Sequence, residues 1–231
     1  MKGIFDILIV SSTEFEVKKI LQSLDFQYEI NKGLKCYLFD NLNVDVLISG
    51  IGIPMTTYKL TKALLQKKYD FVINAGICGS FNADFSNGTC VNVIQDEFAD
   101  LGITNSDNTF LTLFDEGFIG INEDSFTNGK LITNNSFLNC DLPKVIGITV
   151  SSTSGNMKQI EQRKEKFNAD IETMEGAAVA FVCLSEGIDF IQIRSVSNPV
   201  EPRTKENWDI SLAINNLKDA IIDILKIKQL N

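Results

Sequence analysis

The acids Glu172 and Glu175 stand immediately before a run of small and apolar residues that begins at Gly176. Such a run is typical of a helix that packs tightly against a core. Burying an unpaired carboxylate costs several kcal/mol. The stretch therefore predicts a strand that ends here, a helix that enters the core, and at least one acid held at the mouth of a pocket, where it could accept hydrogen bonds from a ligand.

The sequence contains no histidine, which excludes histidine triads, histidine general bases and imidazole metal ligands. Catalysis must therefore use carboxylates, amides, hydroxyls, lysine, tyrosine or cysteine. The five cysteines are scattered and form no C-x-x-C pair, so neither a disulfide framework nor a zinc site is predicted. A formal net charge of −9 argues against a nucleic-acid partner and favours a small neutral substrate.

A second acidic pair, Glu14 and Glu16, follows a short apolar run over 6–11. Thr13 is a good N-cap, and Glu16 lies three residues later, as a capping box requires. The simplest explanation of both acids is that negative charge stabilises the start of a helix. The alternative is that Glu16 also takes part in chemistry.

Short apolar runs alternate with helical patterns along the chain, and no linker interrupts them. Residues 1–231 are therefore expected to form a single domain. The alternation predicts an α/β fold in three layers, α/β/α, with a central mixed, mostly parallel twisted sheet. The expected strands cover 6–11, 43–49, 69–74, 89–94, 145–150 and 190–196, and the expected helices follow Thr13 and Glu175 and cover 55–67, 157–167 and 208–228.

Two glycine-bearing loops, 50–54 and 75–80, are expected to leave the ends of consecutive strands. Ligands bind at this edge of open α/β sheets, although tight turns between strand and helix explain the same glycines equally well. A polar loop over 151–156 precedes the helix 157–167, whose charged residues are expected to face solvent.

The region 103–143 permits no assignment of elements. Within it, Phe110, Phe114 and Phe118 have i,i+4 spacing, which favours a helical core stripe or a subunit interface over ligand contact. No apolar run is long enough for a membrane span, and the N-terminus does not look like a signal peptide. Together with reduced cysteines, these features predict a soluble, cytoplasmic protein.

Several motifs, each weak alone, occur in one order along the chain: Ser11–Glu16, Ser49–Gly52, Asn74–Gly79, Glu172–Gly176 and Ile193–Asn198. In this order the chain resembles the purine nucleoside phosphorylase and nucleosidase superfamily over nearly its whole length. The resemblance is closest to the nucleosidase branch, which contains methylthioadenosine/S-adenosylhomocysteine nucleosidase and futalosine hydrolase. Its most specific part is Met174–Glu175 before a small-residue helix, together with Ser-x-Ser-Asn at the end of the next strand.

The resemblance implies an N-ribosyl hydrolase that needs no metal or organic cofactor and forms a homodimer or higher homo-oligomer. Cleavage of a purine N-glycosidic bond builds positive charge on the sugar, which carboxylates can stabilise. Glu16 would orient and deprotonate the attacking water, Glu175 would accept hydrogen bonds from ribose hydroxyls, and Met174 would pack under the sugar. Further substrate contacts are implied for Thr173, Gly79, Ser197 and Asn156.

Asn198 departs from the adenine-cleaving nucleosidases, which usually have an aspartate that protonates the base. An asparagine amide cannot transfer that proton, but it can donate to O6 or N7 of a 6-oxopurine. By resemblance the substrate would be futalosine, cleaved to hypoxanthine and dehypoxanthine futalosine in menaquinone biosynthesis. The alternative is a turn-forming asparagine before Pro199.

Arg203 is the candidate partner for the benzoate of futalosine, unless it is a surface arginine paired with a nearby glutamate. The segments 11–17 and 75–80 contain no arginine, which favours water over phosphate as the acceptor. Three alternatives stay open: a methylthioadenosine/S-adenosylhomocysteine nucleosidase, a purine nucleoside phosphorylase, and a non-catalytic nucleoside-binding protein.

Overall fold

The computed structural model describes residues 5–133, 140–202 and 205–230. Its strands are β1 (Phe5–Ser11), β2 (Asp25–Asn31), β3 (Leu34–Phe39), β4 (Leu42–Ile48), β5 (Phe71–Ser80), β6 (Cys90–Asp96), β7 (Gly102–Thr104), β8 (Phe110–Thr112), β9 (Leu131–Ile132), β10 (Lys144–Thr149), β11 (Ile171–Thr173) and β12 (Phe190–Pro199). Its helices are α1 (Glu14–Leu21), α2 (Ile53–Gln66), α3 (Met157–Phe167), α4 (Gly176–Ser185) and α5 (Ile210–Leu230), with a 3₁₀ turn over Lys205–Asn207.

One mixed sheet runs through the molecule in the order β11-β10-β6-β12-β5-β1-β4-β3-β2. The central neighbours β12, β5, β1 and β4 are parallel, whereas β3 pairs with β4 and β6 with β12 in antiparallel fashion. The short strand β11 pairs with β10 and also with the end of β5. The strands β5, β12, β6, β10 and β11 therefore close into a ring, and the expected mixed α/β fold is confirmed.

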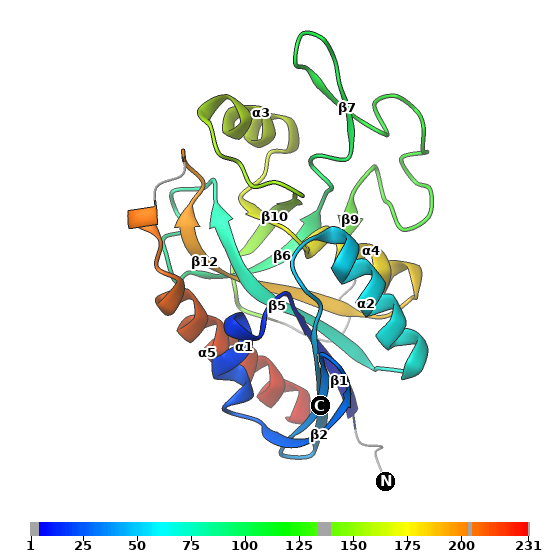
Figure 1. Ribbon diagram of the computed structural model, residues 1–231, viewed down its shortest axis with the longest axis vertical. Helices are drawn as coiled ribbons and strands as arrows, with labels where there is room; N and C mark the ends of the chain where they lie inside the picture. The colour runs from blue at the N-terminus through cyan, green and yellow to red at the C-terminus, as the bar shows by residue number, and fades with distance from the viewer. Residues whose placement is uncertain (1–4, 134–139, 203–204, 231) are drawn as a thin grey trace.

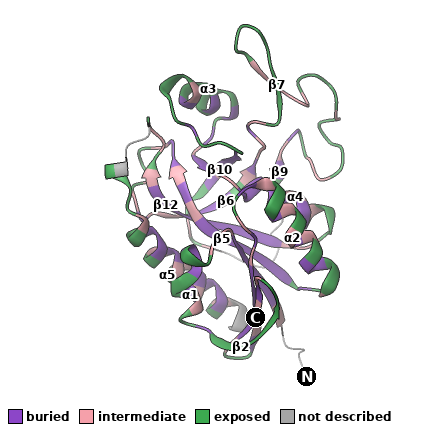
Figure 2. Ribbon diagram, viewed as in Figure 1, coloured by how far each residue is buried: buried purple, intermediate pink, exposed green. Residues whose placement is uncertain are grey.

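Helices cover both faces of the sheet (Figure 1). On one face α5 packs on β12 and β5 and contacts α1; on the other, α2 contacts α4. Two apolar clusters fill the space between these layers and the strands, and the central strands β1, β4, β5 and β12 are buried along most of their length (Figure 2). This burial on both faces explains why the apolar runs of the sequence located most of the strands.

Residues 75–80 do not form the loop expected from the sequence, because they continue β5 as far as Ser80. They pair with residues 193–199 of β12, and the last of them also pair with β11. Small residues are compatible with this pairing where neighbouring side chains approach the backbone. A β-carbon at Gly76 would overlap Arg194, and one at Gly79 would lie 2.8 Å from Val200.

The predicted helical stripe of phenylalanines in the region 103–143 is wrong. Phe110 lies in β8, which forms a small hairpin with β7. Phe118 is 66% exposed, on the excursion over residues 102–130 that projects from the sheet (Figure 1). Phe114 instead packs edge-on against Phe126, with ring centroids 5.0 Å apart. The sequence analysis also missed the hairpin of β2 and β3, since every residue of β2 is exposed and its apolar pattern is weak.

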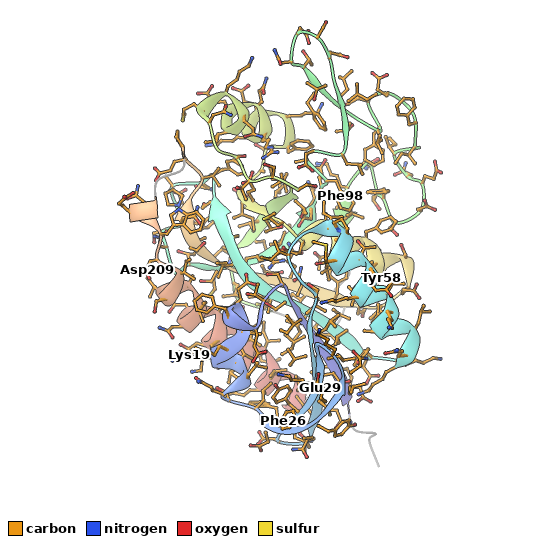
Figure 3. All side chains as sticks on the ribbon, viewed as in Figure 1. Lys19, Phe26, Glu29, Tyr58, Phe98 and Asp209 are labelled. Carbon is orange, nitrogen blue, oxygen red and sulfur yellow. The ribbon has the colours of Figure 1, made fainter. Side chains whose placement is uncertain are left out.

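At the base of this excursion Phe98 contacts the helix α4 through Phe181, with ring centroids 6.5 Å apart (Figure 3). Among the described residues, no helix is both long and apolar enough to cross a membrane.

Candidate functional site

Glu16 lies in the first turn of α1, at the carboxyl end of β1, and is 8% exposed. The predicted capping box is confirmed: Thr13 accepts from the Glu16 amide, and the Glu16 carboxylate accepts from the Thr13 amide at 3.2 Å. The same carboxylate oxygen, Oε2, also accepts from the hydroxyls of Ser11, Ser12 and Thr13. Its other oxygen, Oε1, accepts from the Ile77 amide at 3.3 Å.

Because Oε2 is crowded with donors, Oε1 is the Glu16 oxygen that retains capacity for a further hydrogen bond. A β-carbon at Gly76 would overlap Nη1 of Arg194 and lie 3.3 Å from this oxygen. The carboxylate and the guanidinium therefore converge over Gly76, where the missing side chain leaves room for both.

Arg194 comes from β12 and is 2% exposed, among the largest fully buried side chains of the protein. Its Nε and Nη2 atoms have no hydrogen-bond partner among the described residues. A buried charge without direct partners is costly, so its retention here points to a ligand or to charges nearby. The Arg194 charge does lower the pKa of the carboxyls of Glu175 and Asp96, against the larger effect of their burial.

Glu175 stands between β11 and α4 and is 8% exposed. Its Oε1 accepts from the Gly52 amide at 2.8 Å, at the turn that begins α2. Gly52 adopts φ +92°, a conformation that favours glycine and aims its N–H at the carboxylate. The second carboxylate oxygen, Oε2, accepts no hydrogen bond among the described residues, and so remains available to a ligand.

Burial raises the pKa of the Glu175 carboxyl. Arg194 and the Gly52 amide act in the opposite direction, and the charge of Glu16 raises the pKa further. The site thus contains two interacting carboxylates, at the starts of α1 and α4, near the buried cation of β12. Such an arrangement can stabilise developing positive charge on a bound sugar and hold a water molecule beside it.

The predicted purine-contact residues lie further along β12. Asn198 pairs in register with Gly79 of β5, and Gly79 pairs in turn with Glu172 of β11. The Ser197 hydroxyl donates to Oδ1 of Asn198 at 2.8 Å, and the Asn198 amide nitrogen donates to the Pro199 carbonyl at 2.8 Å. The ring of strands therefore brings Asn198, Ser197 and Gly79 together.

Other predicted contacts are placed differently. The Thr173 hydroxyl lies 3.1 Å from that of Thr149 and accepts from the Gly176 amide, while Met174 is half-buried beside Glu175. Asn156 caps α3 through the Gln159 amide and lines a cavity of about 790 Å³ between α3 and the β7–β8 hairpin. Arg203 lies outside the described residues.

The sequence analysis left Glu172 without a task and assigned the charges of α3 to solvent. The second assignment is wrong for Arg163, which is 8% exposed and binds Glu172 at 3.1 Å. Glu172 also accepts from the Ser154 amide at 2.8 Å, and Arg163 donates to the Ser152 carbonyl at 2.9 Å. This buried ion pair fixes the loop 151–156, because its backbone groups have these charges as partners.

Arg194 is the site residue that the sequence analysis missed. In the sequence it is a single arginine inside the apolar run 190–196, which could have marked it as a candidate. Its relation to Glu16 and Glu175 follows only from the packing of β12 in the folded protein.

The family model described as the phosphorylase superfamily matches residues 6–227. A futalosine hydrolase from Streptomyces coelicolor is 32% identical over 77% of the chain and 76% of the relative. A 5′-methylthioadenosine/S-adenosylhomocysteine nucleosidase from Buchnera aphidicola is 25% identical over 96% of each. The structure of the corresponding nucleosidase from Helicobacter pylori superposes with a TM-score of 0.81, at 20% identity over 97% of this chain and 99% of that one.

We predict that Glu175→Gln stabilises the fold at neutral pH. The folded-state pKa of Glu175 is raised, so ionisation costs folding stability once the pH exceeds that pKa. The gain should be present at about pH 7 and should shrink as the pH falls toward about 4, where the wild-type carboxyl is increasingly protonated in both states. Urea unfolding at the two pH values measures this difference in the free energy of unfolding. Glu165→Gln, which removes one exposed carboxylate, is the matched control. An equal effect at both pH values would contradict the prediction.

Proposed function

The chain belongs to the phosphorylase superfamily, and from this membership and the geometry of its site we propose that it hydrolyses the N-glycosidic bond of a purine nucleoside, with futalosine as substrate and hypoxanthine as the released base. This activity would give the protein a step in menaquinone biosynthesis. The observation that carries the proposal is the convergence of Glu16 Oε1 and Arg194 Nη1 over Gly76, close to the carboxylate of Glu175.

The proposed mechanism divides the work among these three side chains. Glu16 accepts the proton of a water molecule held between its Oε1 and the Arg194 guanidinium. Glu175, fixed at one oxygen by the Gly52 amide, accepts hydrogen bonds from ribose hydroxyls with the other. As the bond to the base breaks, positive charge grows on the ribose, and both carboxylates stabilise it more strongly than they stabilise the neutral substrate.

Hydrolysis is favoured over phosphorolysis by the charge beside Arg194. A phosphate dianion seated on this guanidinium would meet the Glu16 carboxylate at short range, and like charges in a poorly solvated site repel strongly. Water carries no charge and can donate to Glu16 while accepting from Arg194.

Futalosine is favoured over methylthioadenosine by Asn198 and by the higher identity to the Streptomyces relative. The Ser197 hydroxyl lies 2.8 Å from Oδ1 of Asn198 and 3.1 Å from the Cys78 carbonyl. When it donates to Oδ1, the amide NH₂ is the group of Asn198 that is left for a base. One of its hydrogens is used by the Pro199 carbonyl. The other can donate to O6 or N7 of hypoxanthine.

A homo-oligomer is also part of the proposal. Three apolar side chains in α2 or just before it, close to the turn that binds Glu175, are strongly exposed: Ile51 (53%), Met55 (47%) and Tyr58 (68%), the last labelled on α2 in Figure 3. Contact with a second copy would bury them, and a monomeric mass in sedimentation would contradict this part.

Substrate and acceptor are tested together by incubating the protein with futalosine, inosine and methylthioadenosine, each with and without phosphate, and separating the products by chromatography. Release of hypoxanthine from futalosine without phosphate is the expected result. Adenine release from methylthioadenosine would instead indicate the second nucleosidase specificity, and strict phosphate dependence would indicate a phosphorylase. No turnover of any of the three would contradict enzymatic activity.

Glu16→Gln should lower kcat for futalosine by about 10² to 10⁴, the usual cost of losing a general base. The glutamine can still accept hydrogen bonds from the surrounding hydroxyls, so the fold and KM should change little. Glu14→Gln, two positions earlier and largely exposed, is the matched control. Near-normal turnover by Glu16→Gln would show that the water is activated elsewhere.

Asn198→Asp should shift the preference toward adenine-releasing substrates, because a protonated aspartate can donate to N7 of adenine whereas the amide cannot transfer a proton. We expect the ratio of kcat/KM for methylthioadenosine to that for futalosine to rise by about tenfold or more. The two values are measured on the same preparations, with Asn215→Asp, at an exposed position of α5, as the control for an added carboxylate. An unchanged ratio would remove Asn198 from base recognition.

A further inference from the structure

The helix that presents Glu175 begins in an unusual way. The first turn of any helix has backbone N–H groups without intrahelical partners, and the side chain of the N-cap residue commonly accepts from one of them. Glu175 is the N-cap residue of α4, yet its side chain makes no capping hydrogen bond. Its carboxylate turns away to the Gly52 amide instead. Something else must satisfy the start of α4.

Two threonines from neighbouring strands satisfy it. The Gly176 amide donates to the Thr173 hydroxyl at 3.2 Å, and the Ala177 amide donates to the Thr149 hydroxyl at 2.7 Å. The two hydroxyls lie 3.1 Å apart. Helix α4 is therefore capped from outside, by the ends of β10 and β11.

The Asp96 carboxylate, which can only accept, fixes the direction of each hydrogen bond in this chain. The Thr149 hydroxyl donates to Oδ1 of Asp96 at 3.0 Å. Having given its proton to Asp96, Thr149 accepts from both the Ala177 amide and the Thr173 hydroxyl, which uses its full capacity. Every polar group between the start of α4 and Asp96 then has a partner.

Asp96 is a rigid anchor for this chain of hydrogen bonds. It is 2% exposed, and it accepts from Gln192 at 2.8 Å and from the Glu97 amide at 2.9 Å. A β-carbon at Gly176 would overlap Oδ2 of Asp96, so the glycine lets the helix start sit directly on the carboxylate. Burial raises the pKa of Asp96 to about 6, which leaves it mainly ionised at neutral pH and able to accept.

We propose that Thr149 is a positioning residue for the ribose-binding carboxylate: by capping α4 in place of Glu175, it keeps the Glu175 side chain from capping its own helix and leaves it free for the substrate. The proposal rests on the proposed function of Glu175. Without the Thr149 hydroxyl, the Ala177 amide loses its acceptor, and the carboxylate of the N-cap residue is the nearest group with the usual capping geometry. Capping of the Ala177 amide then competes with ribose binding for the Glu175 carboxylate.

A purely structural role for Thr149 would predict something different. Loss of a buried hydrogen bond lowers stability and would reduce turnover of all substrates by the same factor. Loss of positioning lowers turnover only to the extent that the substrate carries the hydroxyls that Glu175 holds. A comparison of the wild type and a Thr149 variant on the substrate and on analogues that lack one ribose hydroxyl separates the two roles.

The experiment measures kcat/KM for futalosine and for its 2′-deoxy and 3′-deoxy analogues. The wild-type protein should prefer futalosine over at least one analogue, and Thr149→Val should reduce that preference by about tenfold or more, as expected when a hydrogen bond to a charged group is lost. Thr149→Ser retains the hydroxyl and should restore the preference. Thr173→Val removes the acceptor of the Gly176 amide and the hydrogen bond to the Thr149 hydroxyl. It should act in the same direction and serves if Thr149→Val does not fold.

Amide hydrogen exchange provides the second readout. Exchange at Ala177 should be about tenfold faster or more in Thr149→Val than in the wild type. Thr133→Val also loses one hydroxyl-donated hydrogen bond, a partly buried one to the Val93 carbonyl, and should leave Ala177 protected. An equal loss of activity on futalosine and both analogues would overturn the proposal. Absence of futalosine hydrolysis by the wild type would instead contradict the proposed substrate, while faster exchange at Ala177 would still support external capping of α4.

Discussion

The site depends on a buried arginine charge. Arg194 lies almost fully inside the protein, two of its nitrogens have no hydrogen-bond partner among the described residues, and the carboxylates around it approach without forming a direct ion pair there. Transfer of such a charge from water is costly, and only nearby negative charge or a bound ligand offsets it. The positions of Glu16 and Glu175, and the absence of a side chain at Gly76, can be understood as conditions for holding this charge.

Local helix chemistry is used twice, in opposite ways. At α1 the capping box and the functional carboxylate are the same group: the hydroxyls and amide that cap the helix also fix Glu16, and crowding at Oε2 leaves Oε1 facing Arg194. At α4 the two are separated, since Thr149 and Thr173 cap the helix and Glu175 is left to the site. The capping box and the proposed catalytic role of Glu16 are therefore compatible.

The closed ring of strands connects the turn that carries Glu175 to Asn198, the residue proposed to contact the base. β11 bonds to β5 and β10, so the turn that carries Glu175 is tied directly to the strand of Gly79 and, through it, to Asn198 of β12. The ion pair of Arg163 and Glu172 holds the loop 151–156 against the same ring. In the proposed function, strand register rather than flexible loops would set the separation between the ribose held by Glu175 and the base contacted by Asn198, which suits a reaction that depends on orientation.

The sequence by itself determined most of the strands, the capping box that starts α1, the small-residue helix that follows Glu175, and the positions of the acids Glu16 and Glu175 at the starts of these two helices. These features are local: apolar runs, capping residues and small-residue patterns follow from neighbours within a few positions. It could not determine that 75–80 continue a strand, that Phe110, Phe114 and Phe118 form no helical stripe, or that Arg163 is buried, because each depends on partners more than a few residues away. Only the tertiary structure revealed that Arg194 is buried and that Thr149 accepts from the Ala177 amide at the start of α4. In the sequence, Arg194 is one arginine within an apolar run, and Thr149 is a threonine at the end of a strand. The packing of β12 places the Arg194 charge where it lowers the pKa of Glu175, and the packing of β10 places Thr149 against the first turn of α4.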